Sequence, residues 1–151
     1  MYASLTQWVP APRRAPEGET LFAIGDVHGY ADELEAIQHR VLAEISTGTM
    51  RRSTIVYLGD YIDRGPDSAR TLDLLTVNPP DDENIRRVYL TGNHDQYLLE
   101  LVRPGRRPDR DFLSMWFDNG GESTLRCKAA ASGGPLLFDT VAVAWCAQRS
   151  P

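Results

Sequence analysis

The sequence of 151 residues is poor in cysteine and histidine and has no long apolar run. No stretch approaches the roughly 20 consecutive apolar residues of a membrane-spanning helix, so we expect no membrane partner. Residues 1–19 also lack the apolar core of a signal peptide. Cys127 and Cys146 form no C-x-x-C pair, which favours reduced thiols without a role. These absences predict a cytoplasmic protein.

The charge balance argues against proteins that coat nucleic acid or bind membrane surfaces. The formal net charge is −5, with 25% charged and 42% hydrophobic residues. Binding to nucleic acid usually needs a positive patch, so we expect no nucleic-acid partner. The composition is that of an ordinary globular domain, which excludes a disordered chain or a coiled coil. A cluster of acidic metal ligands is compatible with this charge.

Short apolar runs alternate with helical patterns along the chain. Three runs of β type cover residues 21–24, 54–58 and 85–90. Apolar residues at helical spacing follow between 34 and 45, from Pro66 to 77, at 98–102 and at 112–117. This alternation predicts a parallel α/β sheet with right-handed crossovers. Ligands of such sheets bind at the carboxyl ends of the strands.

Three glycine-containing motifs follow the predicted strands. They are GDVHG at 25–29, GDYIDRG at 59–65 and GNHD at 92–95. Asp26 and His28 are two residues apart, so an extended backbone would point both side chains to one face. Carboxylate and imidazole together suit manganese, iron or zinc better than calcium. Each motif alone is a common surface turn, but three in order after three strands predict one metal centre.

With these motifs, the sequence resembles the calcineurin-like metallophosphoesterases, and most closely the bacterial serine/threonine phosphoprotein phosphatases. The resemblance lies in GDVHGY, YLGDYIDRGPDS and LTGNHD, and to a lesser degree in WFDNGGEST at 116–124. It covers about residues 20–126. It implies a partial αββα sandwich in which the first, mostly parallel sheet and its helices are present and the second sheet is largely missing.

The resemblance also implies a ligand set for two divalent metal ions, manganese, iron or zinc. Asp26 and His28 would bind the first ion, Asp60 would bridge both, and Asn93 would bind the second. Two such ions a few ångströms apart can share a hydroxide and clamp a phosphoryl group for in-line attack. The implied reaction is hydrolysis of phosphate monoesters, with a phosphorylated protein or a small phosphoester as substrate.

Three residues carry the remaining implied roles. His94 would protonate the leaving alkoxide, and Asp63 would orient His94 by a hydrogen bond. Arg64 would grip the phosphate oxygens with its planar fork, and Asn93 would also face the substrate. A phosphate ester needs positive charge on its equatorial oxygens, which the arginine and the metal ions supply.

The match has gaps that weaken the second metal site. Family members have two further metal-binding histidines and usually another arginine after the third motif, but no histidine follows His94 here. His39 falls among the polar positions of the first helix, which predicts a solvated residue. We interpret the chain as a lead-in at 1–19, the amino-terminal part of the domain at 20–126 and an atypical tail at 127–151. In this interpretation the member is truncated and its first sheet has an exposed apolar face.

Three alternatives remain open at this point. The chain could be a truncated, non-catalytic relative that binds metal or phosphate weakly. It could hydrolyse dinucleoside polyphosphates or nucleotides, although Asp63 favours the phosphoprotein phosphatases because symmetrical tetraphosphate hydrolases usually lack an acid there. It could also fail to fold stably alone, which cooperative unfolding of a monomer would contradict.

Overall fold

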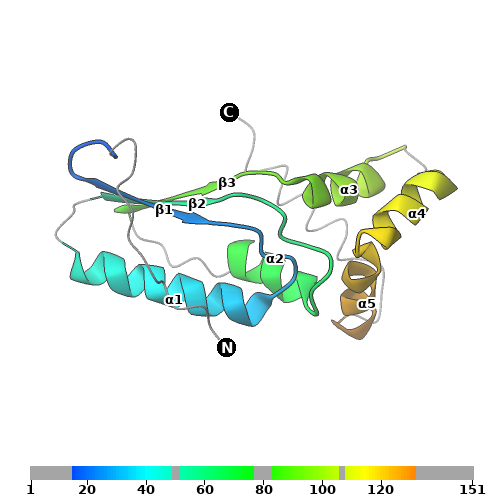
Figure 1. Ribbon diagram of the computed structural model, residues 1–151, viewed down its shortest axis with the longest axis horizontal. Coiled ribbons are helices and arrows are strands. Elements are labelled where there is room, and N and C mark those ends of the chain that lie inside the picture. The colour runs from blue at the N-terminus through cyan, green and yellow to red at the C-terminus, as the bar shows by residue number, and fades with distance from the viewer. Residues whose placement is uncertain (1–14, 49–51, 77–82, 106–107, 132–151) are drawn as a thin grey trace.

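The computed structural model describes residues 15–48, 52–76, 83–105 and 108–131 (Figure 1). Strands and helices alternate in the order β1 Glu19–Ile24, α1 Ala31–Thr47, β2 Arg52–Tyr57, α2 Ser68–Thr76, β3 Ile85–Tyr89, α3 Asn93–Val102, α4 Arg110–Asp118 and α5 Gly121–Ala131. The expected lead-in up to residue 14, the turn at 78–82 and most of the tail lie outside the described residues. The predicted α/β class is confirmed.

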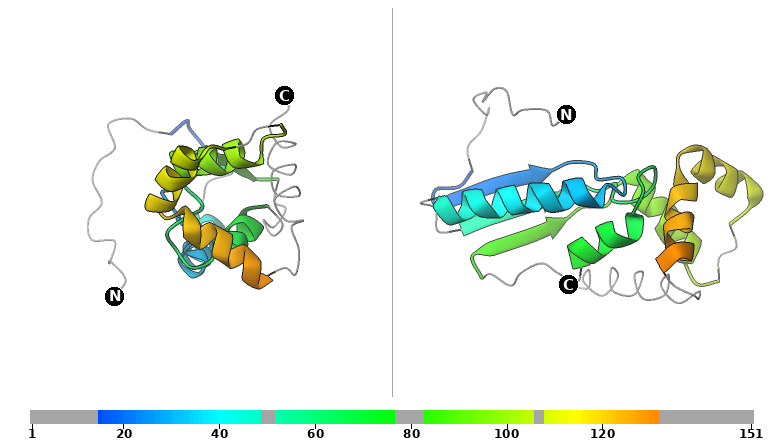
Figure 2. Two further views of the ribbon diagram at one scale, coloured as in Figure 1. Left: turned by 90° about the vertical axis from the view of Figure 1, so that its right-hand side faces the viewer. Right: turned by 90° about the horizontal axis from the view of Figure 1, so that it is seen from below.

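The three strands form one parallel sheet in the order β1-β2-β3. Ile24 pairs with Tyr57, and Tyr57 pairs with Tyr89, so the carboxyl ends of the strands are level. Helices α1 and α2 cover the same face of the sheet, and α3, α4 and α5 gather beyond its carboxyl end (Figures 1 and 2). The sheet therefore directs every strand-end loop toward these three helices.

The core lies between the sheet and helices α1 and α2. Leu34 of α1, Ile55 of β2 and Leu75 of α2 are almost completely buried there. Burying one such side chain contributes about 1.5–3 kcal/mol, so this layer is the main source of stability. Ile37 is an exception to the expected apolar stripe, because 44% of its surface is exposed.

On the opposite face of the sheet, large apolar side chains at and just beyond the strands are exposed. Leu21, Leu58 and Leu90 keep 54%, 48% and 44% of their surface exposed. No element within the described parts of the chain packs on this face (Figure 1). This agrees with the sequence expectation of an uncovered sheet face.

The helices near the carboxyl end of the sheet differ from their predicted bounds. Helix α2 begins at Ser68 rather than at Pro66, because the Asp67 carboxylate caps it by accepting the Arg70 N–H at 2.9 Å. Helix α3 begins at Asn93, so the third motif forms its first turn rather than a loop. Helix α5 was not expected, since its only large apolar residue is Leu125 and its pattern is weak.

Two further sequence expectations can be compared with the structure. His39 is exposed on α1, as predicted. Cys127 is a free thiol whose Sγ donates to the Pro66 carbonyl at 2.6 Å, while Cys146 lies outside the described residues. Among the helices of the described ranges, none has the length and apolar content that crossing a membrane requires.

Candidate metal centre and active site

Backbone hydrogen bonds join the first two motifs at the carboxyl ends of β1 and β2. The amides of Val27 and His28 both donate to the Asp60 carbonyl, at 3.0 and 2.8 Å. The Gly65 amide donates back to the His28 carbonyl at 2.8 Å. The two motifs therefore form one rigid unit rather than two independent loops.

Three potential metal ligands meet at this unit. One donor atom each from His28, Asp60 and His94 lies within 4.8 Å of the others. Nδ1 of His28 donates to the Ile62 carbonyl at 3.0 Å, so its Nε2 carries the lone pair that faces the site. A histidine oriented by its second ring nitrogen is typical of metal ligands. Two imidazoles and a carboxylate fit a divalent transition metal.

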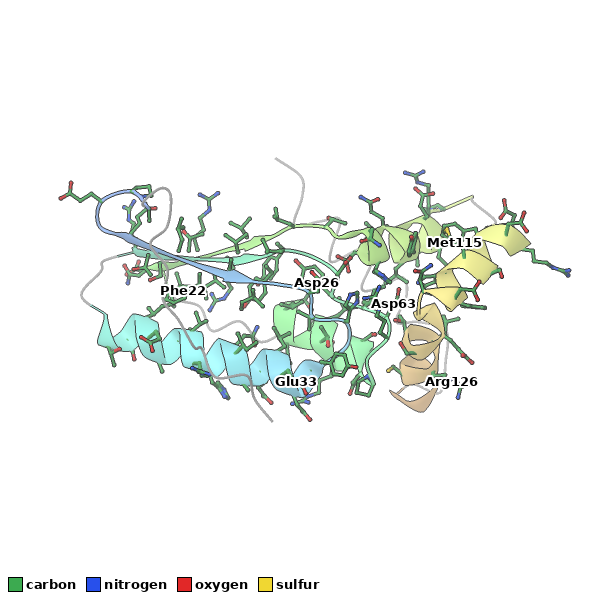
Figure 3. All side chains as sticks on the ribbon, viewed as in Figure 1. Phe22, Asp26, Glu33, Asp63, Met115 and Arg126 are labelled. Atoms are coloured by element: carbon green, nitrogen blue, oxygen red, sulfur yellow. The ribbon has the colours of Figure 1, made fainter. Side chains whose placement is uncertain are left out.

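Asp26 stands beside this cluster. Its Oδ2 lies 3.8 Å from His28 Nε2, and 64% of its side chain is exposed. Figure 3 shows Asp26 just beyond β1 and Asp63 farther toward α4. We expected an extended backbone at these two ligands, but His28 has a φ of 47°, outside the extended region. His28 lies in the turn in which the Tyr30 N–H donates to the Val27 carbonyl at 3.1 Å.

Asp60 reaches the centre from the end of the second strand, while Asn93 lies at the start of the helix that follows the third strand. The backbone N–H of His94 donates to Asp60 Oδ1 at 2.9 Å, which fixes the carboxylate against the first turn of α3. Asn93 precedes His94 and has an exposed side chain. A Cβ on Gly92 would lie 2.0 Å from Asp60 Oδ1, so glycine at this position makes the close approach possible.

His94 and Asp63 form a buried pair. Nδ1 of His94 lies 2.8 Å from Asp63 Oδ2, and the two side chains are 2% and 0% exposed. A carboxylate can only accept here, so Nδ1 carries the proton and Nε2 is left facing the site. This is the orienting contact expected of Asp63, and His94 could act as an acid after Nε2 takes up a second proton.

Arg64 lies between the two histidines. Its Nη1 donates to His28 Nε2 at 2.8 Å, and its Nη2 donates to His94 Nε2 at 3.0 Å. Its backbone N–H donates to the Gly120 carbonyl at 3.0 Å. The guanidinium therefore brings positive charge to the position where the metal ligands converge.

Backbone strain is concentrated at the same residues. His28, Asp60, Asp63 and Arg64 are the non-glycine residues with positive φ in the described parts of the chain, at 47°, 53°, 73° and 66°. Each such conformation costs on the order of 1 kcal/mol or more. The surrounding hydrogen bonds must offset this cost, and strain of this kind is typical of functional sites.

Sequence reasoning assigned no role to three residues that support the site. Asp95 accepts the amides of Asp60, Tyr61 and Gly92 at 2.8, 2.9 and 2.8 Å. Burial raises the pKa of Asp95 despite these three bonds. Trp116 and Thr124 both donate to Asp63. The sequence contained signals for these residues, because Asp95 ends the GNHD motif and Trp116 and Thr124 begin and end the WFDNGGEST segment.

Comparison with known proteins shows similarity to bis(5'-nucleosyl)-tetraphosphatases. The chain is 32% identical over 131 residues to a symmetrical bis(5'-nucleosyl)-tetraphosphatase of Delftia acidovorans, covering 78% of this chain and 42% of that protein. It is 41% identical over 108 residues to the symmetrical enzyme of Escherichia coli K12, covering 63% and 35%. It is 40% identical over 83 residues to the asymmetrical enzyme PrpE of Oceanobacillus iheyensis, covering 53% and 32%.

These relatives correct the finer part of the sequence interpretation. Their names are those of tetraphosphatases, so they give no support to the serine/threonine phosphoprotein phosphatase branch that Asp63 had favoured. The chain spans less than half the length of the relatives it matches. Membership of the broader phosphoesterase family is decided by a separate comparison, with family models.

The family comparison covers most of the described structure. The model of the calcineurin-like phosphoesterases matches residues 20–134, a range that contains all three motifs and every element from β2 to α5. The parallel sheet and its helices agree with a partial fold of this kind. The chain belongs to the calcineurin-like phosphoesterase family.

Proposed function

We propose that this protein is a metal-dependent phosphohydrolase whose substrates are dinucleoside polyphosphates. The observation that carries the proposal is the convergence of donor atoms from His28, Asp60 and His94 within 4.8 Å. The names of its relatives support the substrate class, because they act on bis(5'-nucleosyl) tetraphosphates. The three motifs support phosphoester hydrolysis as the reaction, because they lie in the range that matches the calcineurin-like phosphoesterases.

The proposed metal ligands are Asp26, His28, Asp60 and Asn93. Bound divalent ions supply Lewis acidity toward a phosphoryl oxygen and lower the pKa of water. His28 is held for this role by its bond to the Ile62 carbonyl. Asp60 is held by the His94 amide. Asn93 is exposed at the start of α3, one residue before His94.

Arg64 is the proposed phosphate-binding residue. Its fork can donate two parallel hydrogen bonds to phosphoryl oxygens, a geometry that lysine cannot match. In the structure both Nη atoms already donate to ring nitrogens that line the site. A phosphate that enters would replace these two neutral acceptors with charged oxygens, which form stronger bonds.

A second candidate reaction is hydrolysis of phosphate monoesters. The Asp63–His94 pair favours it. Nδ1 of His94 is bonded to Asp63, and Nε2, which accepts from Arg64 in this structure, could take up a proton from solvent once Arg64 turns to a phosphate and pass that proton to the leaving group. An alkoxide leaving group needs a proton as it departs, whereas a phosphate leaving group of an anhydride departs without one. The Asp63–His94 pair should therefore accelerate the hydrolysis of monoesters more than that of polyphosphates.

The test compares two substrates on the purified 151-residue chain with added Mn²⁺. Diadenosine tetraphosphate and p-nitrophenyl phosphate would be offered in parallel, with the Asp60→Asn variant as control. Faster, Asp60-dependent cleavage of the tetraphosphate supports the first candidate. Faster cleavage of the monoester supports the second.

Chromatography of the products adds a further distinction. Two molecules of adenosine diphosphate mean central cleavage, and one monophosphate with one triphosphate means cleavage away from the centre. No turnover of either substrate by a folded, manganese-bound chain would overturn both candidates and support the non-catalytic alternative.

A further inference from the structure

We propose that Trp116 and Thr124 are positioning residues that hold Asp63, and through it His94, for proton transfer. The proposal deepens the second candidate of the proposed function, monoester hydrolysis, and rests on it, because the alkoxide that leaves a monoester needs a proton as it departs. It also assigns a role to the WFDNGGEST segment at 116–124, which contains none of the proposed metal ligands.

Asp63 is completely buried, and its carboxylate oxygens are held by three donors. Oδ2 accepts from His94 Nδ1 at 2.8 Å and from Trp116 Nε1 at 2.7 Å. Oδ1 accepts from Thr124 Oγ1 at 2.6 Å. Buried carboxylates need such donors, since an unpaired buried charge is very costly. Two of the three donors come from α4 and α5, outside the three motifs.

Thr124 holds both the side chain and the backbone of Asp63. Its hydroxyl proton goes to Oδ1, and its oxygen accepts the Asp63 backbone N–H at 2.9 Å. Ser68 lies 3.0 Å from the same hydroxyl and can donate to it. Asp63 has a φ of 73°, a strained conformation that these two bonds help to stabilise.

Trp116 is itself fixed in place. Its side chain is 0% exposed, and a Cβ on Gly121 would lie 2.4–2.5 Å from atoms of its indole ring. The glycine thus lets the α4–α5 turn press directly against the ring. Indole can only donate, and its single N–H donates to Asp63 Oδ2.

The two donors together determine how His94 is oriented. With Oδ1 occupied by Thr124 and Oδ2 shared with Trp116, the carboxylate cannot rotate away from Nδ1. His94 then keeps the tautomer with its proton on Nδ1 and leaves Nε2 toward Arg64. Loss of either donor would free the carboxylate to turn and let the ring shift, and small misplacements of a catalytic group slow reactions markedly.

A simpler role for these two residues would be to satisfy a buried charge. The experiment must therefore include a readout that stability alone does not move. Trp116→Phe removes the indole donor and keeps an aromatic ring. Thr124→Val removes the hydroxyl at constant shape, and Thr124→Ser restores it. Ser123→Ala is the matched control, because Ser123 Oγ donates to Gly120 in the same turn and does not touch Asp63.

The first readout is the sensitivity of turnover to the leaving group. We expect Trp116→Phe and Thr124→Val to slow hydrolysis of phenyl phosphate by roughly 10–10²-fold, part of the 10²–10⁴-fold effect of a general acid. The loss should be much smaller for p-nitrophenyl phosphate, whose leaving group is more acidic. Thr124→Ser and Ser123→Ala should behave like the unmodified chain. Equal losses on both esters would overturn the proposal.

The second readout is the ¹⁵N NMR spectrum of the His94 ring in the folded chain, which needs no turnover. We expect the Nδ1–H tautomer in the unmodified chain and a mixture of tautomers in the two variants. An unchanged ring spectrum in both variants would overturn the positioning role. If no substrate is cleaved, the proposed function fails, while the NMR result still decides this inference. If Trp116→Phe does not fold, the comparison of Thr124→Val with Thr124→Ser decides it.

Discussion

Nη1 of Arg64 donates to Nε2 of His28 across 2.8 Å. This lone pair is the one that His28 would offer to a metal ion, because Nδ1 is already bonded to Ile62. The two bonds cannot coexist, so metal binding must displace Arg64 from His28. A displaced guanidinium remains next to the centre, where a phosphate can accept its hydrogen bonds.

Arg64→Met should therefore increase metal affinity while it decreases turnover. The substitution removes the competing hydrogen bond and a positive charge but keeps most of the aliphatic stem. A hydrogen bond contributes about 0.5–1.5 kcal/mol net, so we expect Mn²⁺ to bind roughly 2–10-fold more tightly in calorimetric titration. Arg70→Met on α2 is the control, since the Arg70 guanidinium bonds to Asp32 and Glu35 of α1 instead of to a histidine of the centre. Weaker Mn²⁺ binding in Arg64→Met would contradict the competition.

Asp60→Asn should abolish metal binding and activity together. Asp60 lies where the second strand ends, with one oxygen accepting the His94 amide, and it is the only carboxylate of the three-residue cluster. An amide removes the negative charge that the ions need. Metal content by atomic spectroscopy and turnover would be measured side by side. Asp73→Asn on the exposed side of α2 is the control, and retained turnover in Asp60→Asn would refute the bridging role.

His94→Ala distinguishes two possible roles of His94 Nε2, proton transfer and metal binding. If Nε2 transfers protons, turnover of monoesters should fall by roughly 10²–10⁴-fold with metal content unchanged. If Nε2 is a ligand of the cluster, metal content should fall as well. The measurement is manganese per chain after gel filtration, with the exposed His39→Ala as control. We expect the first result, because the proposed ligand set is Asp26, His28, Asp60 and Asn93, and His94 is the proposed acid.

The strands and the motifs at their ends could be predicted because their signals are local. Each short apolar run stops at a glycine, and the parallel topology then brings 25–29, 59–65 and 92–95 together without further information. Even so, the conformation of His28 could not be predicted. Its positive φ comes from the backbone bonds that the next strand end provides, not from its own neighbours.

The support behind the site could not be predicted for a different reason. Trp116 lies 53 positions from Asp63 along the chain, and Thr124 lies 61 positions away. Bonds over such separations leave no periodic pattern. Helix α5, which carries Thr124, is weakly amphipathic and packs through its first turn instead of through an apolar stripe.

Asp95→Asn should destabilise the fold by about 1–3 kcal/mol, the usual cost of leaving a buried polar group unpaired. Its carboxylate accepts three backbone amides from the second and third motifs. The amide nitrogen of asparagine would face at least one of these donors and could not accept. Urea unfolding measures the change, with the exposed Asp118→Asn on α4 as control. Equal unfolding midpoints for the two variants would contradict the bridging role of Asp95.

Stability should fall in alkaline solution because of the stacked pair Tyr57 and Tyr89, whose rings lie 5.0 Å apart. Burial raises the pKa of Tyr89 to about 12 and raises that of Tyr57 as well. A folded-state pKa above the unfolded value of about 10 means that ionisation favours the unfolded chain. The contribution is thus complete below about pH 10 and is lost as the pH rises toward 12. Tyr89→Phe should flatten the decline of the thermal midpoint over this range, while Tyr30→Phe, at an exposed position, should leave it unchanged. A decline that is equally steep in Tyr89→Phe would exclude this phenol as its cause.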